Sequence, residues 1–182
     1  MTTRLTDRLR EALDRETGQT IELLEVEAGG WKVTLGAAHV ESLAVSAIQL
    51  RVEASAARVG ISDARPERPV QVSDAAQRLA NTATYLTEPL TVMEVDRLAD
   101  EALVRSQRPE AAESDSDFRR YFEVRMTGDA AQLARYETNA AGRARIEFRL
   151  TRDVIERLVG DFVIALTPAA TEERRFGGFR VV

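Results

Sequence analysis

The chain has 182 residues and a net charge of −5, so it is long enough to bury an ordinary hydrophobic core, while its charge disfavours non-specific binding to nucleic acid or anionic lipid. Cysteine is absent, and histidine and lysine occur once each, as His39 and Lys32. This composition argues against thiol catalysis, zinc fingers, a histidine-rich metal centre and a lysine Schiff base.

Arginine supplies almost all of the positive charge, with 24 Arg against one Lys. This ratio, together with abundant alanine, is typical of a GC-rich bacterial genome. The alternative is that the arginines bind anions, which requires a cluster on one face that the sequence alone does not show. No stretch approaches the roughly 18–20 apolar residues of a membrane span, and the N-terminus has no signal-like apolar region. We therefore expect a cytoplasmic protein.

The first elements predicted are a helix and a β-hairpin. Residues 4–15 place leucines on one edge of an amphipathic helix, at positions Leu5, Leu9 and Leu13. Gly18 is expected to end this helix. Residues 20–27 are rich in strand-forming types, two glycines follow at the turn, and residues 31–35 alternate between apolar and polar side chains. This pattern predicts an antiparallel hairpin.

A loop is predicted around Gly36 and His39, followed by a third half-buried strand over residues 46–54. Residues 58–70 contain two of the five prolines and show no sustained period, so they are the best candidate for a subdomain boundary. The predicted organisation is a helix-plus-three-strand unit, a linker, a second helix-and-strand unit and a tail, at 1–57, 58–72, 73–167 and 168–182. One compact domain over the whole chain is the alternative.

Ser73 is positioned to cap a helix over residues 73–87, which Pro89 prevents from continuing. Strands are predicted at residues 90–96 and 102–107, before a polar segment at 109–117.

The remaining elements are a three-stranded meander and a closing helix. The meander is predicted over residues 119–126, 131–137 and 144–150, from alternating patterns separated by two turns. Its inward residues are expected to be Phe122, Val124, Met126, Ile146, Phe148 and Leu150. Thr151 is expected to cap a helix over residues 152–163, whose apolar stripe would cover the meander.

Residues 21–27 and 90–96 match in residue class at six of seven positions, and each segment follows a predicted helix. An internal duplication would explain this similarity, although so short an apolar and acidic match also arises by chance. Because strands cluster along the chain, we predict an α+β fold, with antiparallel sheet covered on one face by about three helices.

Candidate chemistry is sparse. Six carboxylates could act together if the two similar segments approached each other, namely Glu25, Glu27, Glu94, Asp96, Asp100 and Glu101. Acids alternate in residues 113–117, but this segment lacks the glycine and the distal glutamate of a calcium loop. His39 is the one candidate base, and no glycine-rich nucleotide-binding motif is present. We therefore assign no catalytic residue, no metal and no cofactor.

The C-terminal tail mixes charged, aromatic and glycine residues without a period. It is the strongest candidate for a partner-binding peptide, through Arg174, Arg175, Phe176, Phe179 and Arg180. The alternative is that the tail packs on its own domain as a short edge strand.

The function we favour is a non-enzymatic cytoplasmic adaptor, able to form a homodimer, whose sheet face or edge binds a protein partner. Two alternatives stay open. One is a carboxylate-based hydrolase or metal-binding protein that uses Glu25, Glu94 and Asp96. The other is an apolar-ligand binder with a pocket between sheet and helix, lined by Trp31, Phe122 and Tyr136.

Overall fold

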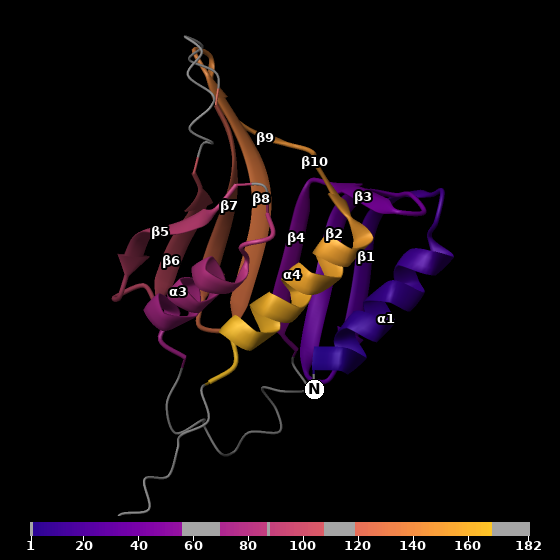
Figure 1. Ribbon diagram of the computed structural model, residues 1–182, viewed down its shortest axis with the longest axis horizontal. Helices are drawn as coiled ribbons and strands as arrows, with labels where there is room; N and C mark the ends of the chain where they lie inside the picture. Colours follow the sequence, from indigo (N-terminus) through magenta and orange to yellow (C-terminus); the bar gives the residue numbers. More distant parts are fainter. Residues whose placement is uncertain (1, 56–69, 87, 108–118, 169–182) are drawn as a thin grey trace, which may run out of the picture.

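The computed structural model describes residues 2–55, 70–86, 88–107 and 119–168, which form a mixed α+β structure with a ten-stranded antiparallel sheet and three helices (Figure 1). The helices are α1 (Thr2–Arg15), α3 (Val72–Thr82) and α4 (Arg152–Ala165). The strands are β1 (Thr20–Ala28), β2 (Trp31–Val40), β3 (Ala44–Ala47), β4 (Gln49–Ala54), β5 (Leu90–Asp96), β6 (Glu101–Ser106), β7 (Arg119–Thr127), β8 (Ala130–Asn139), β9 (Gly142–Ile146) and β10 (Phe148–Thr151). The path through the sheet is β10-β3-β2-β4-β8-β7-β6-β5, with β1 paired to β2 and β9 paired to β8.

The predicted first hairpin is confirmed. Ala28 pairs with Trp31 across a two-residue turn, and the turn residues Gly29 and Gly30 have φ values of 62° and 80°. Positive φ at both positions is the geometry that two-residue hairpin turns favour, and glycine adopts it without steric cost.

The predicted loop around Gly36 and His39 is wrong, because β2 continues to Val40 and His39 pairs with Thr20 of β1. Glycine and alanine fill this part of β2, so the alternation of polar and apolar side chains that marks a strand is weak there. Ala37, at φ 45°, further interrupts the regular pleat.

The third strand predicted over residues 46–54 is divided into β3 and β4, and the last strand of the predicted meander into β9 and β10. The two divisions are related. β4 and β9 both pair with β8, whereas β3 and β10 pair with each other. The meander of β7, β8 and β9 is therefore confirmed, and the chain leaves it at Glu147 to reach β3.

Helix α1 buries the predicted leucine edge, since Leu5, Leu9 and Leu13 are all within the core. Helix α3 begins at Val72 rather than after a Ser73 cap, because Val72 is itself buried and the capping position falls on Gln71. It also ends at Thr82, before the predicted Thr87. The Ala83 amide still donates to the carbonyl of Leu79, but the Thr84 amide donates to the carbonyl of Thr82, so the helical pattern stops there.

Helix α4 confirms the predicted cap, because Thr151 Oγ1 accepts a hydrogen bond from the Val154 amide at 3.4 Å. Its apolar stripe is fully buried, at Ile155, Leu158, Val159 and Phe162. Helix α4 lies beside β3, β4 and β10 and beside the two other helices, and α3 lies beside β5, β6 and β7. Of the strands in the predicted meander, α4 is therefore nearest to β10, which pairs with β3. That α4 covers the whole meander stays a prediction.

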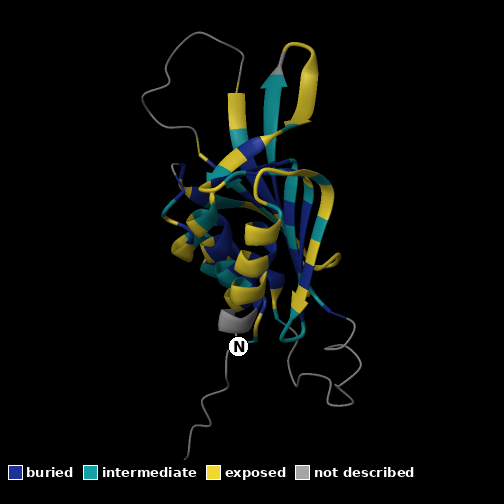
Figure 2. Cartoon of the chain, turned by 90° about the vertical axis from the view of Figure 1, so that its right-hand side faces the viewer, coloured by how far each residue is buried: buried dark blue, intermediate teal, exposed yellow. Residues whose placement is uncertain are grey.

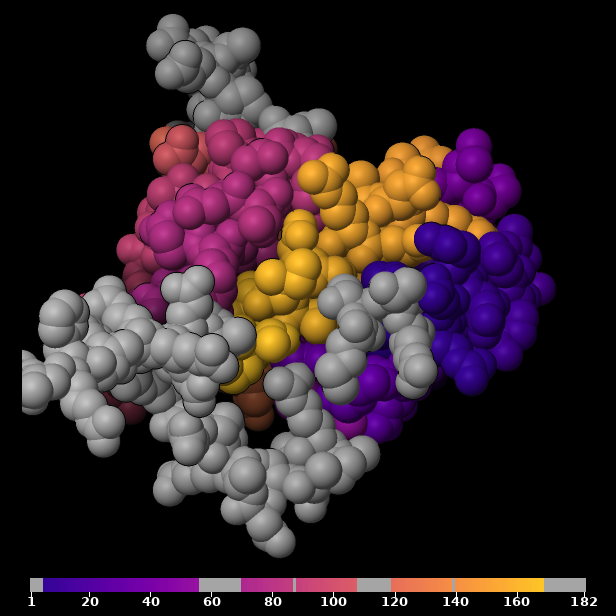
Figure 3. Space-filling model, turned by 60° about the horizontal axis from the view of Figure 1, so that its bottom comes forward, coloured from indigo at the N-terminus to yellow at the C-terminus, as the bar shows by residue number. Residues whose placement is uncertain are grey.

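Figure 3 shows α4 between α1 and α3, and Arg152 links α4 to α1 by donating to the carbonyl of Leu13 at 3.1 Å. No helix in the described part of the chain is long and apolar enough to cross a membrane.

Alternate residues of the central strands have different surroundings. Leu50 of β4, Leu133 of β8 and Val124 of β7 pair in register, and all three belong to the hydrophobic core with the helices. Their neighbours point the other way, and we call this second surface the polar face. One row of residues crosses the polar face in register from β2 to β6, and it consists of Thr34, Arg51, Gln132, Arg125 and Leu103.

The two similar segments, residues 21–27 and 90–96, lie in β1 and β5. Each of these strands is the first of a hairpin, and each pairs with only one other described strand. The internal duplication stays a prediction. The predicted boundary falls largely on residues 56–69, outside the described residues, and strands from both sides of it join one sheet where β4 pairs with β8.

Candidate functional site

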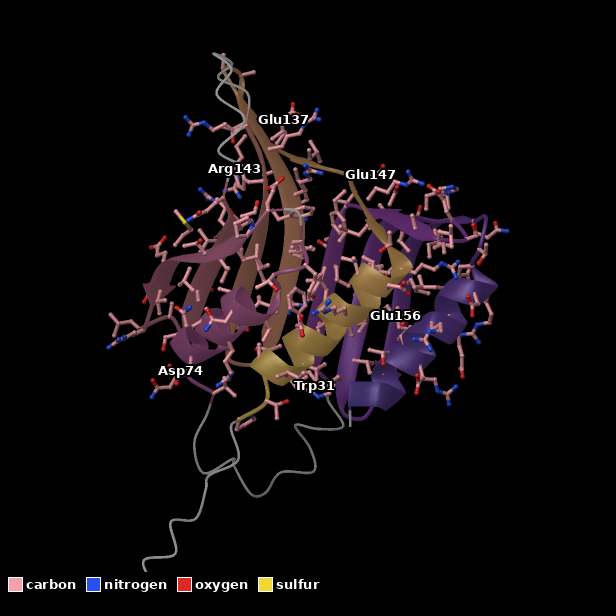
Figure 4. The ribbon with its side chains drawn as sticks, viewed as in Figure 1. Trp31, Asp74, Glu137, Arg143, Glu147 and Glu156 are labelled. Atoms are coloured by element: carbon pink, nitrogen blue, oxygen red, sulfur yellow. The ribbon has the colours of Figure 1, made fainter. Side chains whose placement is uncertain are left out.

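Charged and aromatic side chains gather on the polar face where β6, β7, β8 and β9 run side by side. We call this group the arginine–tyrosine cluster, made up of Arg105, Tyr121, Glu123, Arg125, Tyr136, Arg143 and Arg145. Strand pairing places its members together, because Tyr121, Tyr136 and Arg145 are in register across three strands, and Arg105 pairs with Glu123. Arg143, on the β9 side of the cluster, lies at the opposite end of the sheet from Trp31 (Figure 4).

Glu123 is the centre of the cluster. Its side chain is only 1% exposed, although it belongs to the polar face. Three guanidinium groups surround its carboxylate, with nitrogen–oxygen distances of 2.7 Å from Arg143, 3.0 Å from Arg105 and 3.4 Å from Arg125. Burial acts to raise the pKa of Glu123, but hydrogen bonds from Arg143 and Arg105 outweigh it and hold the pKa below its ordinary value.

Two stacked tyrosines support the arginines. The rings of Tyr121 and Tyr136 have centroids 6.0 Å apart. The guanidinium of Arg143 lies 3.7 Å from the centroid of Tyr136, and that of Arg105 lies 4.5 Å from the centroid of Tyr121. Both distances are within the range of cation–π attraction. The arginines are therefore held from two sides, by the Glu123 carboxylate and by the ring faces.

Arg145 differs from the other arginines of the cluster because its hydrogen-bond partners are neutral. It donates to Gln49 Oε1 at 3.0 Å and to the Tyr136 hydroxyl at 3.3 Å, which ties β9 to β4. The cluster thus has four arginines and one glutamate, a net charge of +3 within a chain whose net charge is −5. The local charge has the opposite sign to the charge of the whole chain.

A hollow of about 380 Å³ adjoins the cluster, and Arg125 belongs to both. Its lining is of three kinds. The polar and basic residues are Arg51, Arg125, Gln132 and Thr127, the acidic residues are Glu94, Asp96 and Glu101, and the apolar residues are Ala102, Leu103, Met126 and Ala130. The polar face therefore changes from basic at β7–β9 to acidic at the β5–β6 hairpin.

The six predicted carboxylates do not form one site. Glu25 lies in β1 and Glu94 in β5, which are separated by the strands of the central sheet, so the two segments do not approach each other. Glu25 instead pairs with Lys32 at 2.9 Å. Asp96 accepts hydrogen bonds from the backbone amides of Ala99 and Leu98, which lower its pKa and assign it to the turn.

We expect added Mg²⁺, Ca²⁺ or Zn²⁺, or a chelator, to leave the melting temperature unchanged. Among the residues that the structure describes, no three His, Asp or Glu side chains converge in a way that could hold a metal ion. A metal that bound the folded state alone would raise the melting temperature by mass action. Differential scanning fluorimetry at stoichiometric metal measures this, and a rise of several degrees would contradict the expectation.

The three residues predicted to line an apolar pocket do not lie together. Trp31 is in the core, and Phe122 packs edge-on against Phe148 there, whereas Tyr136 is on the polar face. Phe122 and Tyr121 are adjacent in β7 and so point to opposite faces, and Tyr136 pairs with Tyr121. The candidate base His39 contacts the Thr20 hydroxyl at 2.9 Å.

The tail residues predicted to bind a partner lie outside the described residues, as do the acids of residues 113–117. The tail residues are Arg174, Arg175, Phe176, Phe179 and Arg180.

Sequence reasoning did not identify the arginine–tyrosine cluster. The signal was present in β7, where Tyr121, Glu123 and Arg125 alternate with the core residues of the meander. Chemically, the cluster offers fixed N–H donors and positive charge, which suit it to binding an anionic group. Comparison of the chain with models of protein families, with curated proteins and with solved structures finds no match.

Proposed function

We propose that this chain is a non-enzymatic cytoplasmic adaptor that binds a protein partner through the polar face of its sheet. In this proposal α1, α3 and α4 cover one face of the sheet, and the opposite face is left for the partner. The observation that carries the proposal is the arginine–tyrosine cluster, a preorganised group of arginines and tyrosines on that polar face.

Composition supports a protein partner, because arginine and tyrosine are among the residue types most enriched in the energetic centres of protein interfaces. Rigidity supports it as well. Arg143 is fixed by Glu123 and by the ring of Tyr136, so little side-chain entropy remains to be lost when a partner binds. The hollow beside Arg125 provides a concave surface into which a side chain of the partner can insert.

The pH behaviour of Glu123 argues against acid–base catalysis by the cluster. A general acid or base needs a pKa near the working pH, whereas the arginines lower the pKa of Glu123 away from neutrality. Its carboxylate is also buried beneath those arginines. The cluster is built to hold charge in place rather than to transfer a proton.

Site-specific photo-crosslinking in the native cell tests the proposal. A photoreactive amino acid replaces Gln132 on the polar face in one variant, and Glu11, which is 62% exposed on α1, in the matched control. We expect a defined protein adduct, identified by mass spectrometry, from position 132 and not from position 11. The adduct should weaken when Arg143→Gln and Arg145→Gln are added.

An adduct between two copies of the chain at position 132 would also support the proposal, with a homodimer as the assembly. The proposal is wrong if position 132 gives no protein adduct, if position 11 gives the same adducts, or if the two arginine substitutions leave the yield unchanged.

A further inference from the structure

We propose that the arginine–tyrosine cluster is a receptor for an acidic polypeptide segment of the partner, whose carboxylates bind the guanidinium groups of Arg125, Arg143 and Arg145. This inference rests on the proposed function and adds the chemistry of the partner. Three features of the cluster support it, namely its charge, the way its aromatic rings are used and its accessibility.

The charge of the cluster is only partly neutralised from within. The closest contact that Glu123 makes with each of Arg105, Arg125 and Arg143 uses a single nitrogen, while a guanidinium carries five N–H donors. One carboxylate therefore positions three guanidinium groups without saturating either their charge or their donors. Arg145 adds a fourth positive charge through neutral partners. A ligand that brings further carboxylates completes the pairing that Glu123 begins.

The ring faces distinguish a peptide from a nucleic acid. Proteins that bind single-stranded nucleic acid stack bases on open aromatic rings. Here Arg105 lies over Tyr121 and Arg143 lies over Tyr136, so guanidinium groups already cover those ring faces. Stacking uses the flat face of a guanidinium and leaves its in-plane donors for carboxylate oxygens, which match its fork geometry. The arrangement favours carboxylates over bases.

The cluster is accessible from solvent. The side chain of Arg125 is 68% exposed, and Arg143 and Arg145 lie on β9, which is exposed along most of its length. The β8–β9 hairpin projects beyond the helices in the side view (Figure 2). A bound segment can reach the cluster without displacing any described element.

The acidic end of the polar face sets a direction for the ligand. Glu94, Asp96 and Glu101 line the far side of the hollow and would repel a segment that is acidic along its whole length. An acidic segment is therefore expected to lie along β8 and β9, away from the β5–β6 hairpin, with a neutral or basic residue facing the acidic side of the hollow.

The experiment measures fluorescence anisotropy of the full chain with three labelled probes: a short glutamate peptide, the same peptide with glutamine at every position, and a thymidine oligonucleotide. We expect the glutamate peptide to bind, and the other two probes to bind at least about tenfold more weakly. Arg143→Gln combined with Arg145→Gln should weaken glutamate-peptide binding by about tenfold or more.

The matched control combines Arg8→Gln with Arg149→Gln, which removes the same charge from two exposed arginines outside the cluster. It should bind the glutamate peptide within about twofold of the unaltered chain, since long-range charge effects are screened at physiological salt. Arg145→Gln alone is a second test that spares the Glu123 network, and it should still weaken binding measurably.

If the cluster variant and the control variant lose the same amount of affinity for the glutamate peptide, the inference is overturned, because binding would then follow net charge alone. Tight binding of the oligonucleotide would overturn it in favour of nucleic acid. Absence of glutamate-peptide binding would also overturn it. A crosslink from position 132 that depends on Arg143 and Arg145 would in that case leave the proposed function standing with a partner of different chemistry.

Discussion

Replacing Phe148 with alanine is expected to lower the free energy of unfolding by about 3–5 kcal/mol. The Phe148 side chain is 1% exposed and packs edge-on against Phe122, with ring centroids 6.0 Å apart. It begins β10, the strand that pairs with β3 and leads into α4. The truncation therefore opens a cavity at the point where the second half of the chain joins the strands of the first.

Urea denaturation followed by circular dichroism measures this loss. Ile164→Ala is the matched control, because Ile164 belongs to α4 but is 53% exposed, and its truncation should cost less than about 1 kcal/mol. A loss below about 1 kcal/mol for Phe148→Ala would contradict the placement of this ring in the core.

Local patterns predicted much of the fold. The leucine spacing of α1, the double glycine between β1 and β2, and the Thr151 cap of α4 each specify a structure over a few residues. Such signals depend on the backbone geometry of their own segment, so they can be interpreted without knowledge of the rest of the chain.

Long-range pairing could not be predicted in the same way. Nothing in the sequence of β4 indicates that it pairs with β8, or that β10 leaves the meander to pair with β3. Antiparallel pairing between distant segments is decided by which apolar faces can share a core, and many combinations satisfy a local pattern. This is also why Glu25 and Glu94 could be imagined together from sequence, although they lie on separate outer strands.

The candidate site depends on a local sequence pattern and on long-range strand pairing. Alternation along β7 places Tyr121, Glu123 and Arg125 on one face, and this placement follows from the predicted meander alone. Their meeting with Tyr136 and Arg145 depends on register, and a slip of one residue would have moved these side chains to the opposite face. Composition gave no guidance, because arginine is abundant throughout the chain.

Replacing Glu123 with glutamine is expected to lower the free energy of unfolding by about 2–3 kcal/mol at neutral pH. The carboxylate is buried, and its loss leaves Arg105 and Arg143 without their shared counter-ion. The effect is expected to fall short of the full cost of breaking a buried ion pair, because the side chains of these arginines are 31% and 35% exposed and water can solvate them in part. Glu53→Gln is the matched control. Glu53 also lies beside an arginine, but it is 29% exposed, so the same substitution should cost less than about 1 kcal/mol.

The pH dependence of this loss distinguishes an electrostatic role for Glu123 from a packing role. Its pKa in the folded chain is lowered relative to an unfolded value of about 4.3, so the stabilisation is fully present above that pH. It is lost as the pH falls through the folded pKa, where the carboxylate takes up a proton and becomes neutral like glutamine. The difference in unfolding free energy between the unaltered chain and Glu123→Gln should therefore be largest near neutral pH and shrink below about pH 4. Denaturation curves measured across this range test the assignment, and a difference that stayed constant with pH would show that shape, rather than charge, is what Glu123 contributes.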